Sequence, residues 1–345
     1  MQLTVVIPHL FWPDPELPDI YRDLPLPAAE KLLSRGRHLP DTTHGLLDWL
    51  AQAFQLPAGD MVPLAPLSLA LDGISHDQAY WLRADPVVLQ LNRDQLVLAD
   101  SGVLSLSQHE ADALIDTLNR HFESDGLTFV APHPTRWYVR CAQAPSITVA
   151  AVADIVGQDI HPNLPRGNDA MVWHRHLNEV QMLFYTHPVN EAREQAGDPT
   201  VSSLWFWGGG RHAPLAASRF DTLASDNWEA NALAHAAGCN TVEMPTTASE
   251  WLSQPAAARP LLLLDSLSGP AQYGDAYGWR EAISALERDW LAPLWQALAT
   301  RRIARLELVV PGRLRCVITP AARWAFWRPA RTLSSWAPAS LEARQ

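Results

Sequence analysis

The chain has 345 residues, of which 48% are hydrophobic, and its formal net charge is −11 at pH 7. This length and apolar content predict a large core in two domains, or in one domain that carries an insertion. The acidic balance excludes nucleic acid as the main partner, and no uninterrupted apolar run approaches the ~20 residues of a membrane-spanning helix. The N-terminus lacks the pattern of a signal peptide and the three cysteines lie far apart, so we expect a cytoplasmic protein.

Strands alternate with helices along most of the chain, which favours an α/β fold. Residues 3–7 are nearly all apolar and precede Pro8, as is typical of a strand buried on both faces of a parallel sheet. Apolar residues at helical spacing predict short helices over 28–34 and 43–54. Three prolines between 57 and 66 mark a boundary after these helices.

Residues 77–150 have a different character. Pairs of strands over 87–98 and 127–141 lie on either side of a helix that begins at the capping box of Ser107 and Glu110. The order β-β-α-β-β predicts a small α+β domain with an antiparallel sheet, inserted into the α/β core. We therefore expect a discontinuous core domain of residues 1–76 and 151–330. Residues 77–150 would form the inserted domain, and residues 331–345 a tail.

The second half of the chain returns to the α/β pattern. Its apolar strands and amphipathic helices alternate, and turn residues separate them. The expected elements are a helix over 169–186, a strand over 201–207, a helix between 226 and 238, a strand over 261–264, a helix over 279–299 bent at Pro293, and a hairpin of 306–310 with 314–318.

A candidate ligand site follows the helix over 169–186. The segment from His187 to Arg193 leads into an apolar strand that ends in Gly208, Gly209 and Gly210, and Arg211 follows at once. Ligands bind beyond the carboxyl ends of strands in open α/β sheets, and glycine lets backbone N–H groups approach an anion. Asn190, Arg193 and Arg211 would supply further donors, although the glycines also fit a tight turn and Arg193 also fits a solvated helix surface.

Two other segments carry possible catalytic groups. Asp41, Thr42 and His44 have the atoms of a nucleophile beside a base, but Thr42 or Thr43 would equally cap the following helix. Asp265 ends the strand over 261–264, where it is either a ligand or the cap of the next turn.

The histidines and the C-terminal region suggest further roles. His9 ends the first strand and is better placed for chemistry than His174 and His176, whose spacing puts them on different sides of a helix. Residues 301–331 hold eight arginines and one acidic residue. Together with four aromatic residues, this region fits a docking surface or a cover over the adjacent sheet; the four are Trp324, Phe326, Trp327 and Trp336.

These motifs together resemble the archaeal-type, cofactor-independent phosphoglycerate mutases of the alkaline phosphatase superfamily. That family carries a His-Pro-Val-Asn-x-x-Arg segment, a small-residue turn and an apolar strand ending in a glycine-rich bend, which resemble residues 187–193, 197–199 and 204–210. Arg136 stands where the family has an arginine. The closer likeness is to a bacterial branch named as regulatory, the RpfE type. The resemblance implies an alkaline-phosphatase-like α/β fold, with a mostly parallel sheet flanked by helices and an inserted small α+β domain.

The same resemblance implies a degenerate active centre. Enzymes of the superfamily hold two metal ions with Asp and His side chains and use a Ser or Thr nucleophile. Here the first strand ends in Pro8 and His9 where the family has Asp-Gly, and Pro40 stands at the nucleophile position. Two later His-bearing segments of the family are also replaced, around 266–275 and at Pro311-Gly312. We therefore expect no metal cofactor.

Three functions remain open. The first is a regulatory, non-catalytic protein that binds a small phosphorylated or carboxylate metabolite. The second is an active phosphoglycerate mutase or phosphatase with Mn or Zn, and the third is an interaction scaffold that uses the Arg/Trp-rich C-terminal region. The first would place its pocket at Arg136, Asn190, Arg193, Gly208, Gly209, Gly210 and Arg211, and the second would rebuild a site from Asp41, Thr42, His44, Asp154 and Asp265.

Overall fold

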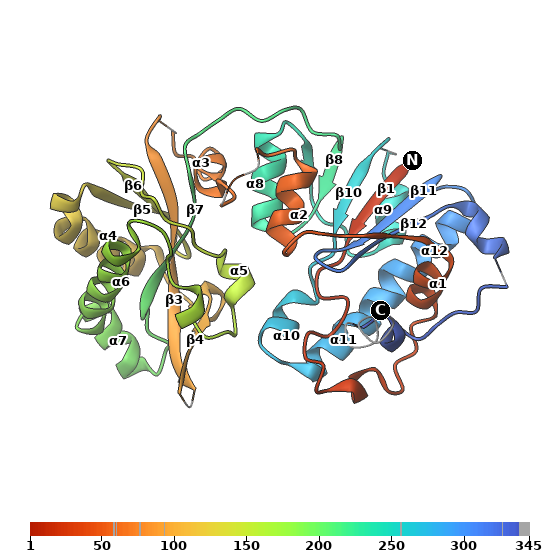
Figure 1. The fold of residues 1–345 in the computed structure, drawn as a ribbon, viewed down its shortest axis with the longest axis horizontal. Coiled ribbons are helices and arrows are strands. Elements are labelled where there is room, and N and C mark those ends of the chain that lie inside the picture. The colour runs from red at the N-terminus through yellow and green to blue at the C-terminus, as the bar shows by residue number, and fades with distance from the viewer. Residues whose placement is uncertain are drawn as a thin grey trace. The chain divides into compact units, whose positions relative to one another are not determined.

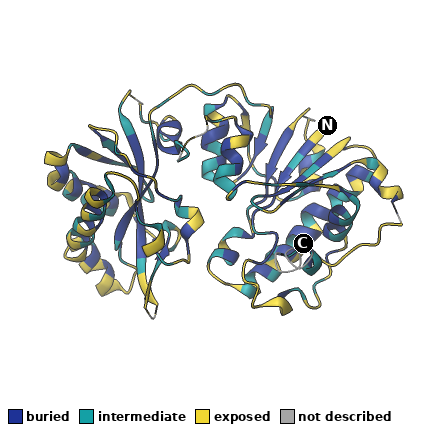
Figure 2. Ribbon diagram, viewed as in Figure 1, coloured by how far each residue is buried: buried dark blue, intermediate teal, exposed yellow. Residues whose placement is uncertain are grey.

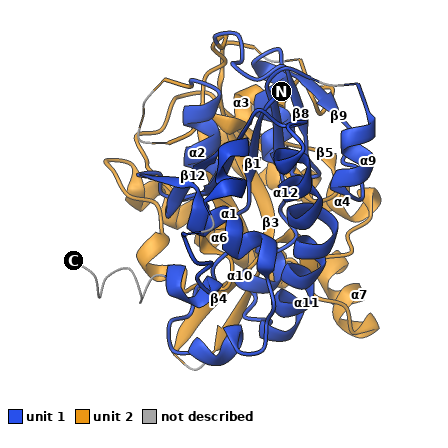
Figure 3. Ribbon diagram, turned by 90° about the vertical axis from the view of Figure 1, so that its right-hand side faces the viewer, with its two compact units in different colours: residues 1–55, 216–345 blue, residues 56–215 orange. Residues whose placement is uncertain are grey.

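The chain forms two compact units. The structure, a computed structural model, describes residues 1–57, 59, 61–75, 77–92, 94–255, 257–325 and 327–337. Unit 1 comprises Met1–Gln55 and Ala216–Gln345, and unit 2 comprises Leu56–Leu215 (Figure 3). The insertion is therefore larger than the sequence predicts, because it also takes in residues 56–76 and 151–215.

Unit 1 is built on a seven-stranded sheet in the order β2-β12-β11-β1-β10-β8-β9. Figure 1 labels the five inner strands of this row, from β12 to β8. Strands β11, β1, β10, β8 and β9 run parallel, whereas β12 runs antiparallel to both β11 and β2. The strands are β1 (Gln2–Val6), β2 (Arg37–Pro40), β8 (Thr222–Ala224), β9 (Asn240–Val242), β10 (Pro260–Leu263), β11 (Arg305–Val310) and β12 (Leu314–Ile318).

The central strand β1 is buried on both faces, as its apolar sequence predicts. Leu3 and Val5 join the large core cluster on one face, and Val6 is fully buried on the other. Figure 2 shows that the strands of both units are largely buried, whereas the outer faces of the helices are exposed. The strand β2 was not predicted, since its four residues are largely exposed and carry no apolar alternation.

Helices cover the unit 1 sheet. The helix expected over 279–299 is interrupted, because a π-helical turn, η5 (Glu287–Leu291), separates α11 (Ala276–Leu286) from α12 (Ala292–Ala299) just before Pro293, which lacks an N–H group. The helices are η1 (Pro18–Tyr21), α1 (Pro27–Arg35), α2 (Leu46–Ala53), α8 (Trp228–Ala236), α9 (Ala248–Ser253), α10 (Ser268–Gln272), α11 (Ala276–Leu286), η5 (Glu287–Leu291), α12 (Ala292–Ala299), η6 (Pro320–Trp324) and η7 (Leu333–Trp336).

Residues 331–337 pack against the rest of unit 1, although the sequence predicts a tail there. Leu333 and Trp336 of η7 are buried, and the Trp336 ring lies edge-on to His38 at 4.4 Å between centroids. These apolar contacts fix residues 331–337, and residues 338–345 lie outside the described residues.

Unit 2 is built on a five-stranded antiparallel sheet in which β4-β3-β6-β5 form a row and β7 also pairs with β3. The strands are β3 (Tyr80–Asn92), β4 (Gln95–Ala99), β5 (Leu127–His133), β6 (Arg136–Cys141) and β7 (Ser203–Gly210). Strand β7 therefore belongs to the inserted unit, whereas the sequence places it in the parallel core. Its uniformly buried pattern is compatible with either sheet, so only the pairing with β3 decides between them.

The capping box that the sequence predicts at Ser107 and Glu110 is present in unit 2. Glu110 accepts a hydrogen bond of 2.8 Å from the Ser107 N–H, and Ser107 Oγ accepts one of 3.3 Å from the Glu110 N–H. Within the described parts of both units, no helix is long and apolar enough to cross a membrane. The helices of unit 2 are α3 (Leu64–Ser68), η2 (Ser101–Val103), α4 (Gln108–Phe122), η3 (Glu123–Asp125), α5 (Val152–Ile155), η4 (His161–Asn163), α6 (Ala170–Tyr185) and α7 (Pro188–Ala196).

Candidate functional site

Polar side chains gather at the carboxyl edge of the unit 1 sheet. His9 follows β1, Asp265 follows β10, Asn227 follows β8 and Arg313 lies on the turn after β11. Because these four strands are parallel, all four loops reach the same edge, which is where open α/β sheets bind ligands. We call these four residues together with Ser268 the carboxyl-edge cluster.

Asp265 is the acidic centre of this cluster. Its Oδ2 accepts a hydrogen bond of 2.9 Å from Asn227 Nδ2, and its Oδ1 accepts one from Ser268 Oγ. Burial raises the pKa of Asp265 above its ordinary value, although both hydrogen bonds and the nearby His9 act in the opposite direction. The protonated carboxyl is thus favoured over a wider pH range than in a solvated aspartate.

His9 faces Asp265 from the neighbouring strand. Its backbone adopts the left-handed conformation with φ of 54°, and its carbonyl accepts a hydrogen bond of 2.9 Å from Trp279 Nε1. Burial lowers the pKa of His9; Asp265 raises it in part, and Arg313 lowers it further. The imidazole is therefore held neutral, with one nitrogen able to donate and the other able to accept.

Asp41 and Thr43 stabilise the turn between β11 and β12. The Gly312 N–H donates to Asp41 Oδ2 at 2.8 Å and to Thr43 Oγ1 at 3.0 Å, and Thr43 Oγ1 donates to the same carboxylate oxygen at 2.7 Å. Thr42 and His44 are exposed on the surface. The predicted helix cap is also corrected, because α2 begins after Gly45 without a side-chain cap.

Within unit 1, the structure keeps the catalytic candidates Asp41 and Asp265 apart. Asp41 follows β2 and Asp265 follows β10, and three strands lie between β2 and β10 in the sheet. At about 4.8 Å per strand, the two strands are roughly 19 Å apart. Asp154 belongs to α5 of unit 2.

The carboxyl-edge cluster does not fit a two-metal centre. Across the described ranges, no group of three or more His, Cys, Asp or Glu side chains is arranged to hold a metal ion. Two divalent ions about 4 Å apart need several anionic or imidazole ligands each, and the cluster supplies one of each kind. The cluster therefore has too few metal ligands to hold the two ions that metal-dependent phosphoryl transfer needs.

In unit 2, the residues expected to bind an anion brace the fold. Arg193 is 4% exposed, and it donates from Nε to the Pro199 carbonyl at 2.7 Å and from Nη1 to Glu110 Oε1 at 2.9 Å. Asn190 donates from Nδ2 to the carbonyls of Phe184 and Val201, both at 2.8 Å, and accepts from the Val201 N–H. These contacts fasten α7 to α4, to the end of α6 and to the segment before β7.

The other two arginines of the expected pocket have different partners. Arg136 forms a bidentate pair with Asp72, at 2.6 Å from Nη2 to Oδ1 and 3.2 Å from Nε to Oδ2, and the Tyr138 hydroxyl donates to the same carboxylate. Arg211 donates to the carbonyl of Gln78. Arg136, Arg193 and Arg211 thus share no hydrogen-bonding partner in the described contacts.

The three glycines allow β7 to pack closely against its neighbours. Gly208 has a φ of 64°, a conformation that favours glycine. A Cβ atom at Gly209 would lie 2.5 Å from Leu82 Cδ2, and one at Gly210 would lie 2.5 Å from Pro63 Cβ. Packing with β3 and the start of α3 therefore explains the glycines without an anion.

The C-terminal region both covers the sheet and exposes aromatic rings. Trp336 is buried, whereas Trp324 and Trp327 are 59% and 69% exposed, and Phe326 lies outside the described residues. The guanidinium carbon of Arg323 lies 4.5 Å from the centroid of the Trp324 ring. A docking role for this region stays a prediction.

Sequence reasoning did not identify Asn227, Ser268 or Arg313 as members of a site. Asn227 does cap α8, with Oδ1 accepting from the Ala230 N–H at 2.9 Å, and its Nδ2 reaches Asp265 as well. The available signal was the position of each residue just beyond a buried strand. That signal becomes specific only once the strand order is known.

Comparisons with known proteins point to phosphoglycerate mutases. No family model matches the chain. The 2,3-bisphosphoglycerate-independent phosphoglycerate mutase of Methanosarcina mazei is 28% identical over 210 residues, which are 54% of this chain and 49% of the relative. A probable enzyme of the same name from Geobacter sulfurreducens is 30% identical over 161 residues, 45% of this chain and 39% of the relative. The chain thus spans about half or less of the length of these relatives.

A solved structure supports the fold class. The PH0037 protein from Pyrococcus horikoshii matches with a TM-score of 0.52 and 13% identity, over 92% of this chain and 86% of that one. The cofactor-independent phosphoglycerate mutase from Thermoplasma acidophilum aligns with a TM-score of 0.47 and 15% identity, over 97% and 94% of the two chains. The chain therefore has the expected α/β fold, with a mostly parallel sheet flanked by helices, and its curated relatives are phosphoglycerate mutases of archaea and bacteria.

Proposed function

We propose that this chain is a phosphoglycerate-mutase-like protein that binds a small phosphorylated or carboxylate metabolite and does not carry out metal-dependent phosphoryl transfer. The observation that carries the proposal is the composition of the carboxyl-edge cluster, where one aspartate and one histidine stand at the strand ends. A regulatory role, as in the RpfE type, is part of this proposal.

The carboxyl-edge cluster offers groups suited to an anion. Arg313 supplies a cation that acts electrostatically on His9, and Asn227, Ser268 and the neutral imidazole are potential hydrogen-bond donors. The raised pKa of Asp265 means that its carboxyl opposes an anionic ligand over a narrower pH range than a solvated aspartate would. The arginines that the sequence assigned to this task, Arg136 and Arg193, are paired with Asp72 and Glu110, so the proposal moves the ligand from unit 2 to unit 1.

A thermal-shift titration with 2- and 3-phosphoglycerate tests the binding. A ligand at about ten times its Kd stabilises the folded state by roughly 1.4 kcal/mol, which gives a measurable rise in Tm. We expect this rise in the wild type and in Arg305→Gln, an exposed arginine at the opposite end of β11, and no rise in Arg313→Gln. A wild-type protein that gains no stability from either ligand would contradict the proposed binding.

An active mutase is the second candidate, because the relatives carry that name and Asp265 has the raised pKa of a potential general acid. Elemental analysis of the purified protein and a coupled mutase assay with Mn²⁺ separate the two functions. Stoichiometric metal together with turnover that Asp265→Asn abolishes would establish the second candidate. Binding without turnover supports the first.

A further inference from the structure

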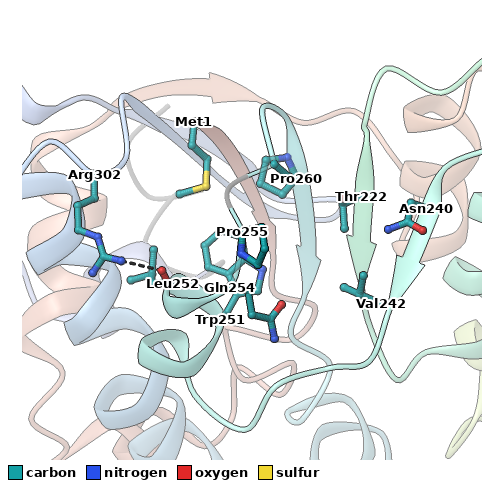
Figure 4. A pocket seen from close by; sticks show the side chains of 11 residues that line it. Met1, Thr222, Asn240, Val242, Trp251, Leu252, Gln254, Pro255, Pro260 and Arg302 are labelled. Carbon is teal, nitrogen blue, oxygen red and sulfur yellow. Dashed lines mark hydrogen bonds between the residues drawn. The ribbon is translucent and has the colours of Figure 1, made fainter.

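A cavity of about 330 Å³ opens at the amino edge of the unit 1 sheet, opposite the carboxyl-edge cluster (Figure 4). Met1 precedes β1, and Thr222, Asn240 and Pro260 are the first residues of β8, β9 and β10, so four strand starts surround the opening. We call it the amino-edge cavity. Its volume lies at the lower end of the range for small-molecule sites, enough for a ligand with a single ring.

The lining of this cavity is apolar with a few polar groups. Arg302 and Asn240 lie at opposite ends, with Trp251 and Pro255 between them (Figure 4). No acidic residue occurs among the described residues that line it, and Arg302 supplies the one charged side chain. The apolar walls come from Met1, Val242, Trp251, Leu252, Pro255, Ala257 and Pro260, and the polar groups from Thr222, Asn240, Gln254 and Arg302.

Hydrogen bonds hold the rim of the amino-edge cavity in place. Asp221 Oδ2 accepts from the N–H groups of Ala258 and Arg259, both at 2.8 Å, and the Gln2 N–H donates to the Ala258 carbonyl at 2.8 Å. Arg302 Nη2 donates to the Leu252 carbonyl at 2.7 Å, which fixes the guanidinium beside the opening. The chain's own contacts therefore hold the rim of the cavity, and such largely pre-formed cavities are usual for small-molecule sites.

We propose that the amino-edge cavity binds a small aromatic carboxylate, a molecule with a flat apolar ring and one negatively charged group. The indole of Trp251 and the two proline rings provide flat apolar walls for an aromatic ring. Arg302 provides a fixed cation for a carboxylate at one end, and its bond to Leu252 leaves the other guanidinium nitrogens to serve as donors. This site is separate from the proposed function, since its residues belong to the other edge of the sheet.

Phenylacetate is the probe for this proposal, with neutral phenylacetamide as its uncharged counterpart. Isothermal titration of the full chain is expected to show saturable binding of phenylacetate at one site, and binding of phenylacetamide at least about tenfold weaker. Arg302→Gln should weaken phenylacetate binding by about tenfold or more while leaving the weak binding of phenylacetamide unchanged. Arg301→Gln is the matched control, because Arg301 is an adjacent exposed arginine that does not line the cavity.

A cavity-filling variant gives an independent test. Ala257→Phe places a ring in the opening and should abolish binding of both probes while 2- and 3-phosphoglycerate behave as with the wild type. If that variant fails to fold, the surface variant Arg302→Gln still decides the question. The proposal is wrong if phenylacetate does not bind at millimolar concentration, if Arg301→Gln weakens binding as much as Arg302→Gln, or if folded Ala257→Phe binds phenylacetate normally.

Discussion

Arg193 Nη1 and Glu110 Oε1 are 2.9 Å apart, in a pair that joins α7 to the first turn of α4. The arginine is almost fully buried, and the glutamate is also the acidic member of the capping box with Ser107. One carboxylate thus completes a helix start and neutralises a buried cation. The motif that most resembles a mutase therefore contributes to the stability of unit 2.

Replacing Glu110 by Gln should destabilise the protein strongly. The change leaves the buried guanidinium of Arg193 without its counter-ion, at a cost of about 2–4 kcal/mol in the free energy of unfolding. Urea titration measures this cost. Asp112→Asn, on an exposed position of the same helix, is the control and should change stability by less than about 0.5 kcal/mol. Equal stability of the two variants would show that the pair is not a structural contact.

The same pair predicts sensitivity to acid. Burial acts to raise the pKa of Glu110, but hydrogen bonds from Ser107 and Arg193 outweigh it and hold the pKa below its ordinary value. A lowered pKa means that the stabilisation is complete above about pH 4.3, the unfolded value, and is lost as pH falls through the folded value. Glu110→Gln should therefore show a shallower loss of stability than the wild type below that pH.

Gly209→Ala and Gly210→Ala should each destabilise unit 2. The added methyl group would overlap Leu82 or Pro63, and overpacking of this kind costs about 1–3 kcal/mol. Gly269→Ala is the matched control, because a Cβ atom there meets nothing within 4 Å and Gly269 lies in a helix. Thermal unfolding compares the three variants. Undiminished stability of both β7 variants would make these glycines candidate anion-binding groups again.

Asp41→Ala should reduce stability by about 1–2 kcal/mol, because the Gly312 N–H and the Thr43 hydroxyl lose their shared acceptor. Thr42→Ala should change stability very little, since Thr42 is exposed. Thr42→Ala should also leave binding of phosphoglycerate at the carboxyl-edge cluster unchanged, because Thr42 makes no contact with the turn that carries Arg313 in the described hydrogen bonds. A loss of binding in Thr42→Ala with unchanged stability would instead support the catalytic interpretation of this segment.

His9 and Asp265 should contribute opposite pH dependences. Since burial lowers the pKa of His9, the unfolded chain takes up its proton first, and stability is lost as pH falls below about 6.5. His9→Asn, which tolerates the left-handed backbone, should flatten this loss. Free energies of unfolding measured from pH 5 to pH 8 provide the comparison, and identical slopes for variant and wild type would contradict it.

For Asp265 the sign is reversed. Its raised pKa means that the folded state binds the proton more tightly than the unfolded chain, so this contribution is complete below about pH 3.9 and is lost as pH rises through the folded value. Asp265→Asn removes the titrating group and keeps the amide oxygen as an acceptor. Its stability relative to the wild type should therefore increase with pH, and a constant difference would exclude burial of the charge as the cause.

Local patterns predicted the elements well. The capping box, the hairpin of β11 with β12 and the apolar strand β1 all appear where the sequence places them, because each depends on residues within one or two turns or on one strand pair. The site was predicted less well. Asp265 and His9 were recognised as ends of strands, but their interaction depends on β1 and β10 being neighbours, although more than 250 residues separate them in the chain.

The sequence by itself determined the α/β class, the presence of an insertion and the positions of most helices and strands. Only the tertiary structure decided that β7 pairs with β3, that Arg193 meets Glu110 and that Arg136 meets Asp72. The partners in these two ion pairs are 83 and 64 residues apart in the chain. An arginine carries the same charge whether it faces a ligand or a buried carboxylate, so its role follows from the side chain that folding brings beside it.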